Sequence, residues 1–345
     1  MDEKEIVKLF LGHGFQLSET ALPLIKENPQ KILSQINTLK PRPFIITKEH
    51  VEKITETKKL DKCPKIELLK KFTYEKKELK AEDYVKHFSK IYEKIKEILL
   101  KNTKLTKLVS INKITWNTKE FSLIFLVRKK GPNNLLAEDP TGETNIFFED
   151  NMRKNFDEIG IDDVLGIVCK KNEEKIYAKN IIYPGVSITR EINKASSNVN
   201  LYYIYKPTLL DDNEFEKLSD ILRQTRKIES IFIFGGWNDR ERLKEFDNTF
   251  LVSEKFNPEL FGIENVKILG LPETDSLENI LDKRLIKGNS LLETFVIEDV
   301  PDIILSSGKE TYSKNYKGTT IISNNDRHKI FIVNLKTREA KERKL

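Results

Sequence analysis

The amino-acid sequence predicts a multidomain α+β protein with a helical N-terminal domain, a central β-barrel and a C-terminal α/β domain. Its 345 residues suffice for two or three domains at roughly 100–200 residues each. Apolar residues first recur with helical spacing, then form short strand-like runs, and finally alternate between strand and helix patterns. We therefore divide the chain into a helical domain, a linker, a helix with a barrel, and a last domain, at 1–55, 56–80, 81–186 and 187–345.

The composition bounds the class of protein. Charged residues make up 33% and apolar residues 38%, and 19 Phe and 10 Tyr argue against disorder throughout the chain. The 60 Lys and Arg exceed the 54 Asp and Glu, and this net charge of +6 permits nucleic-acid contact without requiring it. Cys63 and Cys169 form no Cys-x-x-Cys zinc motif. With a charged N-terminus and no run of about 18 apolar residues, the sequence predicts a cytoplasmic protein with no membrane contact.

The first domain is predicted to be a small helical bundle. Ile6, Leu9 and Phe10 share one face of a first helix. Asn28 and Pro29 are typical of a helix start, because Asn caps unpaired N–H groups and Pro fits the first helical position. One apolar face per helix favours a packed bundle without an activity of its own.

A lysine-rich linker and a long helix follow. Residues 56–80 are predicted as a linker with at most one strand, near Ile66. The segment from about Glu82 to Lys101 is a predicted amphipathic helix. Its apolar residues recur every three or four positions: Tyr84, Phe88, Ile91, Ile95 and Ile98. The lysines on its other faces favour a solvated surface over a nucleic-acid-binding helix.

Short strands are predicted from about residue 109 onward. The candidates are Val109–Trp116, Glu120–Lys130, Leu135–Glu138, Thr144–Phe148, Asp163–Lys170 and Lys175–Tyr183. A helical stretch near Met152–Glu158 precedes the last pair, and Asp139-Pro140-Thr141-Gly142 favours a type I turn. Five of these short strands, with a helix before the last pair, fit a small Greek-key barrel, the OB-fold.

The remaining residues alternate between strands and helices, which predicts an α/β domain with layered sheets. Helices are predicted at Asn213–Arg226 and Ser276–Leu285. The strand candidates are Asn200–Tyr205, Ser230–Phe234, Val266–Leu269, Phe295–Ile297, Asp302–Leu305, Thr319–Ser323 and Lys329–Leu335.

Three parts of the chain occur in a recognisable order. These are the helical unit Ile6–Ile54, the barrel segments Glu138–Gly142 and Ala178–Pro184, and the late stretch Pro301–Gly308. Together they resemble the small (B) subunits of archaeal family-D DNA polymerases and of eukaryotic replicative polymerases. In that resemblance, Pro301–Gly308 matches the last metal motif of a calcineurin-like phosphoesterase domain. The implied fold is an N-terminal helical bundle, an OB-fold β-barrel and a calcineurin-like phosphoesterase α/β sandwich.

The resemblance implies a role in DNA replication, in the cytoplasm at the nucleoid. B subunits hold the C-terminal region of a separate catalytic large subunit on their OB and phosphoesterase domains. In archaeal family-D enzymes the phosphoesterase is usually a working 3′–5′ proofreading nuclease, and in the eukaryotic relatives it is degenerate.

The metal-ligand positions of the family indicate the degenerate kind. A two-metal nuclease holds its ions with carboxylates and imidazoles. At or beside those positions this sequence has Lys206, Thr208, Gly236, Lys309 and Thr311. Asp239 remains but matches no ligand, and His328 comes too late in the chain to match a motif. We therefore predict no catalytic residue, no metal and no cofactor in an inactive domain.

The loss of two cations predicts a further change in the former site. Lys206 and Lys309 stand at the ends of different strands, so their ammonium groups could replace the lost charge. Glu310 and Asp239 are the candidate partners. The alternative is that both lysines point into solvent.

Two other functions stay open. The first is an active metal-dependent 3′–5′ exonuclease whose ligands do not align with the family. The second is a stand-alone OB-fold protein that binds single-stranded DNA through aromatic side chains, although these suit a barrel core as well. The candidate aromatic residues are Trp116, Phe121, Phe125, Phe147 and Phe148. A weak electrostatic DNA contact is predicted at Arg128, Lys129 and Lys130, with a solvated turn as the alternative.

Overall fold

The computed structural model describes most of the chain as a mixed α and β structure with several sheets. It forms two compact units, Met1–Lys65 and Ile66–Leu345. The finer division into four segments stays a prediction. The described residues are 3–26, 28–36, 43–51, 66–72, 80–225, 230–237, 249–253, 258–274, 276–288 and 290–345.

The first unit is mainly helical, as its sequence predicts. It contains α1 (Glu3–Gly12), α2 (Leu22–Ile25) and α3 (Pro29–Ile36), which begins at the predicted Pro. Ile6 and Phe10 of α1 are fully buried in its core. The unit also holds a parallel pair of two-residue strands, β1 (Gln16–Leu17) and β2 (Ile45–Ile46), which the sequence analysis missed. Strands this short leave no period-2 pattern to detect.

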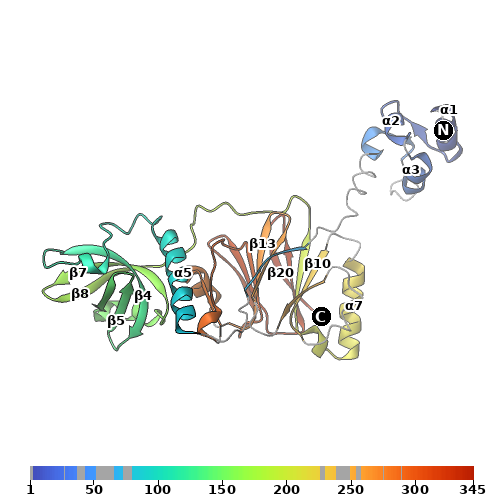
Figure 1. Ribbon diagram of the computed structural model, residues 1–345. Coiled ribbons are helices and arrows are strands. Elements are labelled where there is room, and N and C mark those ends of the chain that lie inside the picture. The colour runs from blue at the N-terminus through green and yellow to red at the C-terminus, as the bar shows by residue number, and fades with distance from the viewer. Residues whose placement is uncertain are drawn as a thin grey trace. The chain divides into compact units, whose positions relative to one another are not determined.

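The second unit contains a closed five-stranded barrel that follows α5 (Ala81–Leu99), and Figure 1 shows the barrel beside that helix. The strand order around the barrel is β4-β5-β6-β8-β7, with one parallel pair, β6 and β8. The barrel strands are β4 (Glu120–Lys130), β5 (Asn134–Asp139), β6 (Gly142–Phe147), β7 (Val164–Asn172) and β8 (Lys175–Ile182). A short helix, α6 (Arg153–Asp157), lies between β6 and β7 as predicted.

One predicted barrel strand is wrong. The residues of Val109–Trp116 contain a 3-10 turn, η1 (Ile111–Lys113), in place of a strand. Ile111 is buried against the barrel core, and its N–H donates to Asp139 Oδ2 at 2.9 Å. The apolar residues of this segment therefore cover the barrel core without pairing along a ladder, so that their spacing imitates a strand.

The rest of the second unit is a sandwich of two sheets, as layered-sheet patterning predicts. The five-stranded sheet has the order β11-β10-β9-β19-β20, and the six-stranded sheet has the order β17-β18-β16-β13-β12-β3. The first sheet comprises β9 (Asn200–Tyr205), β10 (Ser230–Trp237), β11 (Thr249–Ser253), β19 (Lys329–Asn334) and β20 (Ala340–Lys344). The second comprises β3 (Ile66–Lys71), β12 (Glu259–Ile263), β13 (Val266–Leu271), β16 (Ile303–Ser306), β17 (Tyr312–Tyr316) and β18 (Thr319–Ser323).

Three apolar clusters lie between the four layers of helices and sheets in this part of the chain. Tyr203 of β9 and Leu305 of β16 belong to the central cluster, which lies between the sheets. Helix α7 (Asp212–Thr225) packs on the outer face of the five-stranded sheet, and α8 (Leu277–Lys283) packs on the outer face of the six-stranded sheet. The order of layers is therefore helix, sheet, sheet, helix, and Figure 1 shows α7 on the side of the sandwich that faces away from the barrel.

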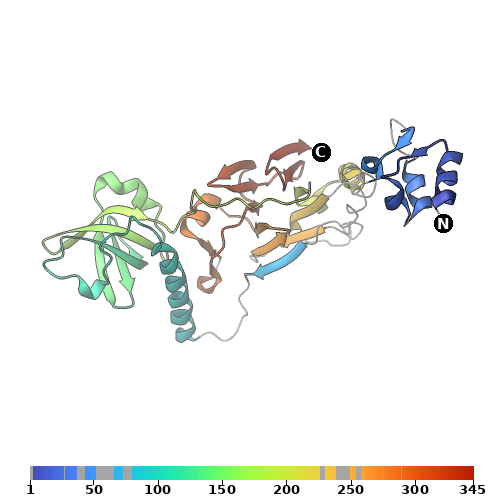
Figure 2. The same ribbon diagram turned by 90° about the horizontal axis from the view of Figure 1, so that it is seen from above.

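The six-stranded sheet recruits a strand from the segment predicted as a linker. Strand β3 pairs antiparallel with β12, from Ile66 opposite Ile263 to Lys71 opposite Glu259. Figure 2 shows these two strands side by side although nearly 200 residues separate them in sequence. A short hairpin of β14 (Leu285–Lys287) and β15 (Thr294–Val296) completes the described elements.

Buried charges join the barrel to the sandwich. Asp163, at the start of β7, is 1% exposed, and its carboxylate oxygens lie 2.7 Å from Lys283 Nζ and 2.6 Å from Lys287 Nζ. Arg284 donates to the carbonyl of Gly185, in the connection that follows the barrel, at 2.7 Å. Two ion pairs and a tethered connection indicate that barrel and sandwich move together. Within the described residues, no helix is both long and apolar enough to cross a membrane.

Helix α5 carries a histidine, His87, that should make the stability of the second unit depend on pH. His87 is half-buried, and burial lowers its pKa from the ordinary 6.5, while a backbone hydrogen bond near Thr294 opposes the shift. Between the lower folded-state pKa and 6.5, the unfolded chain binds more protons than the folded chain. The stability that neutral His87 contributes is therefore fully present above pH 6.5 and is lost as the pH falls through the lower folded-state pKa. We expect His87→Asn to flatten this decline in urea unfolding between pH 7.5 and about 5. Parallel curves for the two proteins would contradict this.

Candidate functional site

The carboxyl ends of parallel strands define where the resemblance places its former metal site. In the six-stranded sheet β13, β16 and β18 run parallel, so their ends meet at one edge. In the other sheet β9, β10 and β11 run parallel. Side chains at such edges converge in α/β folds, which makes this the first place to look for chemistry.

Hydroxyl and amide groups close the edge of the six-stranded sheet. Ser306 Oγ donates to the carbonyl of Pro272 at 2.9 Å, and the backbone N–H of Asn324 donates to the Ser306 carbonyl at 2.9 Å. Ser323 Oγ donates to the Glu310 carbonyl at 2.5 Å. The neighbouring loops are thereby tied to the strand ends by uncharged groups, which cannot replace the carboxylates and imidazoles of a two-metal centre.

The two predicted residues of the last motif are part of this closure. Thr311 Oγ1 donates to Asn325 Oδ1 at 2.6 Å and accepts from the Asn325 N–H at 3.1 Å. The carbonyl of Lys309 accepts a hydrogen bond from the Asn325 amide. Gly308 is required here, because a Cβ at this position would lie 2.4 Å from Ser323 Oγ. These contacts join residues 14 to 16 positions apart, from the loop after β16 to the end of β18, and no local motif indicates them.

The other predicted residues lie along the five-stranded sheet. Lys206 ends β9 in a left-handed conformation with φ 41°, and its ammonium lies 5.1 Å from the ring centroid of Tyr205. Thr208 follows in a 3-10 turn, and Gly236 sits at an irregularity in the pairing of β10 with β11. Asp239 lies outside the described residues. The predicted pairing of Lys206 and Lys309 with Asp239 and Glu310 stays a prediction.

A polar pocket at the end of β9 contains Lys206 together with His328. His328 Nδ1 lies 3.1 Å from Glu214 Oε1 of α7, and Arg327 Nε donates to His328 Nε2 at 3.2 Å. Both ring nitrogens are therefore already engaged by the protein. Across the described residues, no group of three or more His, Cys, Asp or Glu is placed to hold a metal ion. The described residues at the former site do not fit a two-metal centre.

The basic cluster on the barrel is partly neutralised. Arg128 Nε lies 2.6 Å from Glu138 Oε2. Lys130 donates to the carbonyls of Asp157 and Ile159, and burial lowers its pKa. Lys129 is exposed. Two of the three predicted DNA-contact residues thus serve the barrel itself, which favours the solvated turn over a phosphate-binding patch.

The aromatic candidates divide between core and surface. Phe121, Phe125 and Phe148 belong to the barrel core. The strand spacing alone allowed either a core or a DNA-stacking position for these residues. Trp116 is 86% exposed. Phe147 lies on the outside of the barrel, where its ring centroid is 6.1 Å from that of Tyr177.

A cation accompanies this outer aromatic pair. Lys175 lies over the ring of Phe147 with its ammonium 5.6 Å from the centroid. Tyr177 and Lys175 were missed by the sequence analysis, although the alternation of buried Ile176 and Ala178 with polar neighbours in β8 signals their outward direction.

Comparison with protein-family models and with curated proteins finds no match to this chain. The function therefore has to be argued from the fold and from the sites described above.

Proposed function

We propose that this protein is a non-catalytic accessory (B) subunit of a replicative DNA polymerase, with an OB-fold barrel and an inactive calcineurin-like phosphoesterase domain. Its role is to hold the catalytic large subunit. The barrel order supports an OB-fold, because its first strand pairs with the second and fourth while its third pairs parallel with the fifth. The helix-sheet-sheet-helix sandwich supports the phosphoesterase assignment.

The observation that carries the proposal is the closed edge of the six-stranded sheet. Thr311, Ser323 and Asn325 form hydrogen bonds at the ends of its parallel strands, where the resemblance leads us to expect metal ligands. A phosphoesterase fold without its ligands, held to a barrel through the buried Asp163, is suited to presenting a surface and not to hydrolysis.

Purification of the tagged full chain from its native cell tests the proposal directly. We expect a DNA polymerase large subunit to co-purify in about equal amount and to be identified by mass spectrometry, because a B subunit is an obligate partner. Purification of the chain alone, or with unrelated proteins only, would contradict the assignment.

A metal measurement separates the proposal from the exonuclease alternative. After dialysis against manganese, we expect elemental analysis to find well below one ion per chain, because the described strand ends offer Ser, Thr and Asn in place of ligands. The same preparation should leave a 3′-labelled single-stranded oligonucleotide intact. One or two bound ions together with 3′–5′ degradation would support the exonuclease.

Trp116 favours a second candidate function, weak binding of single-stranded DNA by the barrel. Its side chain is 86% exposed, which suits base stacking. The barrel strands also carry exposed lysines, such as Lys129, Lys170 and Lys175, that could contact phosphates. We expect an oligo-dT probe to bind weakly, with about tenfold loss in Trp116→Ala, given roughly 1–3 kcal/mol per stacked base. Raising salt from about 50 to about 200 mM should weaken binding further by counterion release.

The control for this experiment is Ile188→Ala, which removes another exposed apolar side chain, 84% exposed, outside the barrel. Its DNA affinity should equal that of the unmodified protein. Equal binding by Trp116→Ala, or binding that is indifferent to salt, would remove the barrel as a DNA-contacting domain.

A further inference from the structure

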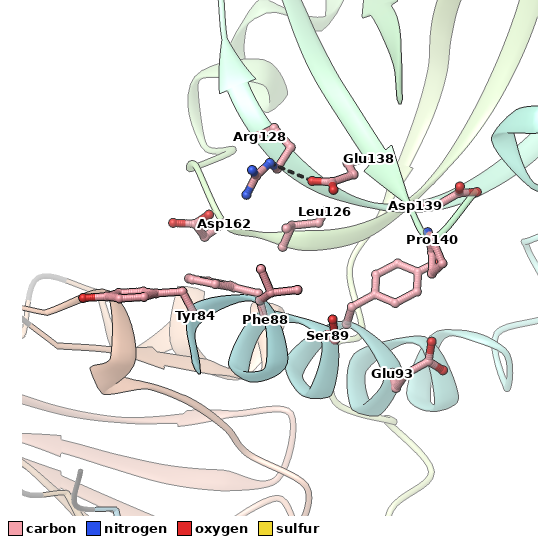
Figure 3. Close-up of a pocket in the computed structure, with 12 residues that line it drawn as sticks. Tyr84, Phe88, Ser89, Glu93, Leu126, Arg128, Glu138, Asp139, Pro140 and Asp162 are labelled. Atoms are coloured by element: carbon pink, nitrogen blue, oxygen red, sulfur yellow. Dashed lines mark ion pairs between the residues drawn. The ribbon is translucent and has the colours of Figure 1, made fainter. Parts of the chain in front are cut away.

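A groove lies between the first half of α5 and the outer face of the barrel. It is a cavity of about 440 Å³, and Figure 3 shows Tyr84 and Phe88 on the side of the helix that faces Leu126 and Arg128 of β4. Its apolar lining consists of Tyr84, Val85, Phe88, Tyr92, Leu126 and Pro140.

The groove exists because α5 contacts the barrel with only part of its length. In its second half, Ile91, Ile95 and Leu99 are buried against barrel residues. Tyr92 donates to the Ile124 carbonyl at 3.2 Å and marks the end of this close contact. Toward the N-terminus the cover becomes incomplete, because Phe88 is only partly buried against the same cluster and Val85 is 68% exposed. The eight steps along the helix from Tyr84 to the buried Tyr92 give a stripe of about 12 Å at 1.5 Å per residue.

The rim of the groove is acidic. Four carboxylates, those of Glu93, Glu138, Asp139 and Asp162, and one guanidinium, that of Arg128, line the groove. Glu138 already pairs with Arg128, and Asp139 is buried and accepts hydrogen bonds from Ile111 and Thr141. Glu93, which is exposed and lies 3.7 Å from Lys96, and Asp162 therefore give the rim its negative charge. The carboxyl group of Asp162 is half-buried, and this burial raises its pKa. Such a rim repels phosphates and acidic peptides and attracts lysine and arginine side chains.

We propose that this groove binds a short segment of another protein that carries apolar side chains flanked by lysine or arginine. The apolar stripe receives the apolar side chains, and the carboxylate rim pairs with the basic ones. The length of the stripe, about two helical turns, suits a short amphipathic helix with anchors three or four residues apart. This inference goes beyond the proposed function and does not depend on a polymerase partner.

Peptide selection on the full chain tests the groove. A phage-displayed library of random peptides is panned on the immobilised protein, and the selected peptides are synthesised and measured by fluorescence anisotropy. We expect enrichment of apolar pairs flanked by Lys or Arg. Val85→Asp and Glu93→Lys should each weaken binding about tenfold or more, because they place a charge on the stripe and reverse one on the rim. Both positions are exposed, so the variants should fold.

Two matched variants control for charge and exposure. Ile188→Asp places the same charge on an exposed apolar residue outside the groove, and Glu97→Lys reverses an exposed charge one turn along α5. Both should bind within about twofold of the unmodified chain. Selection of no peptide, or of acidic peptides, would overturn the proposal, as would equal binding by all four variants. Concentration-dependent dimerisation that Val85→Asp abolishes would assign the groove to a second copy and overturn it too.

Discussion

Asp302→Ala should destabilise the protein by about 3–5 kcal/mol, because it removes a fully buried carboxylate whose negative charge faces two partly buried arginines, Arg190 and Arg338. Asp302 is 0% exposed, and its Oδ1 lies 3.5 Å from Arg190 NH2. Its Oδ2 accepts from the Lys267 N–H at 2.9 Å and from the Asn193 amide at 3.1 Å. Arg338 donates to its carbonyl. At about 2–4 °C per kcal/mol, the midpoint of thermal unfolding should fall by roughly 10 °C.

Electrostatics explains why this single carboxylate matters. Burial lowers the pKa of Arg338 to about 10, and the negative charge of Asp302 opposes that shift. Without the Asp302 carboxylate, these two partly desolvated guanidinium groups repel each other. Among the described residues they keep only uncharged acceptors, such as the Val300 carbonyl for Arg190 and Thr320 Oγ1 for Arg338.

Two further variants make the result specific. Asp299→Ala removes an exposed carboxylate that pairs with Lys267 at 2.9 Å, and it should change stability by less than about 1 kcal/mol. Adding Arg190→Met to Asp302→Ala should be less damaging than the sum of the two single changes, by about 0.5–3 kcal/mol. Strict additivity, or an Asp302→Ala protein as stable as Asp299→Ala, would show that the buried pair contributes little.

Asp163→Ala should lower stability by about 3 kcal/mol and loosen the barrel from the sandwich. The carboxylate is 1% exposed and holds Lys283 and Lys287 of the sandwich, and it also accepts from the Gly160 N–H at 2.7 Å. Without it, both ammonium groups keep only their bonds to the carbonyls of Glu158 and Ile161. The two lysines are 17% and 37% exposed, so water compensates part of the loss and the effect should be smaller than at Asp302.

Limited trypsin digestion distinguishes loosening from general destabilisation. In the unmodified chain, cleavage is expected first within residues 56–80, leaving a fragment that contains barrel and sandwich. In Asp163→Ala, cleavage should also appear in the connection at residues 185–198. Asp157→Ala is the control, because Asp157 forms only an exposed pair with Arg153. An unchanged digestion pattern in Asp163→Ala would mean that other contacts hold the domains together.

Apolar periodicity alone predicted most elements of the second unit. The predicted bounds of β4, β9 and β18 coincide with those in the structure, and α5 differs by one or two residues at its ends. These elements have one or both faces buried, so their sequences carry the full pattern. Among the strands that were missed, β17 and β20 expose most of their side chains and therefore leave little apolar signal. The others in this unit, β11, β12 and β14, are three to five residues long, and β12 is buried along most of its length, so none of them shows an alternating pattern that distinguishes a strand.

For the candidate site, the sequence could predict only which metal ligands are missing. The replacement of metal ligands at Lys206, Gly236 and Lys309 is visible in the sequence once the resemblance is given. The hydrogen bonds by which Ser306, Ser323 and Asn325 close the strand edge are not visible in the sequence. Ser and Asn are common at strand ends, and their partners come from different loops.

The sequence by itself indicated the helical or strand character of most segments and the absence of a recognisable metal motif. These follow from local periodicity and residue type, which need no knowledge of the partner strand. Only the tertiary structure decided that β3 joins a sheet about 200 residues away and that Asp163 and Asp302 carry buried charges. It also decided that the stripe on α5 is half covered and half open. Pairing, burial and charge compensation depend on residues distant in sequence, so no local pattern specifies them.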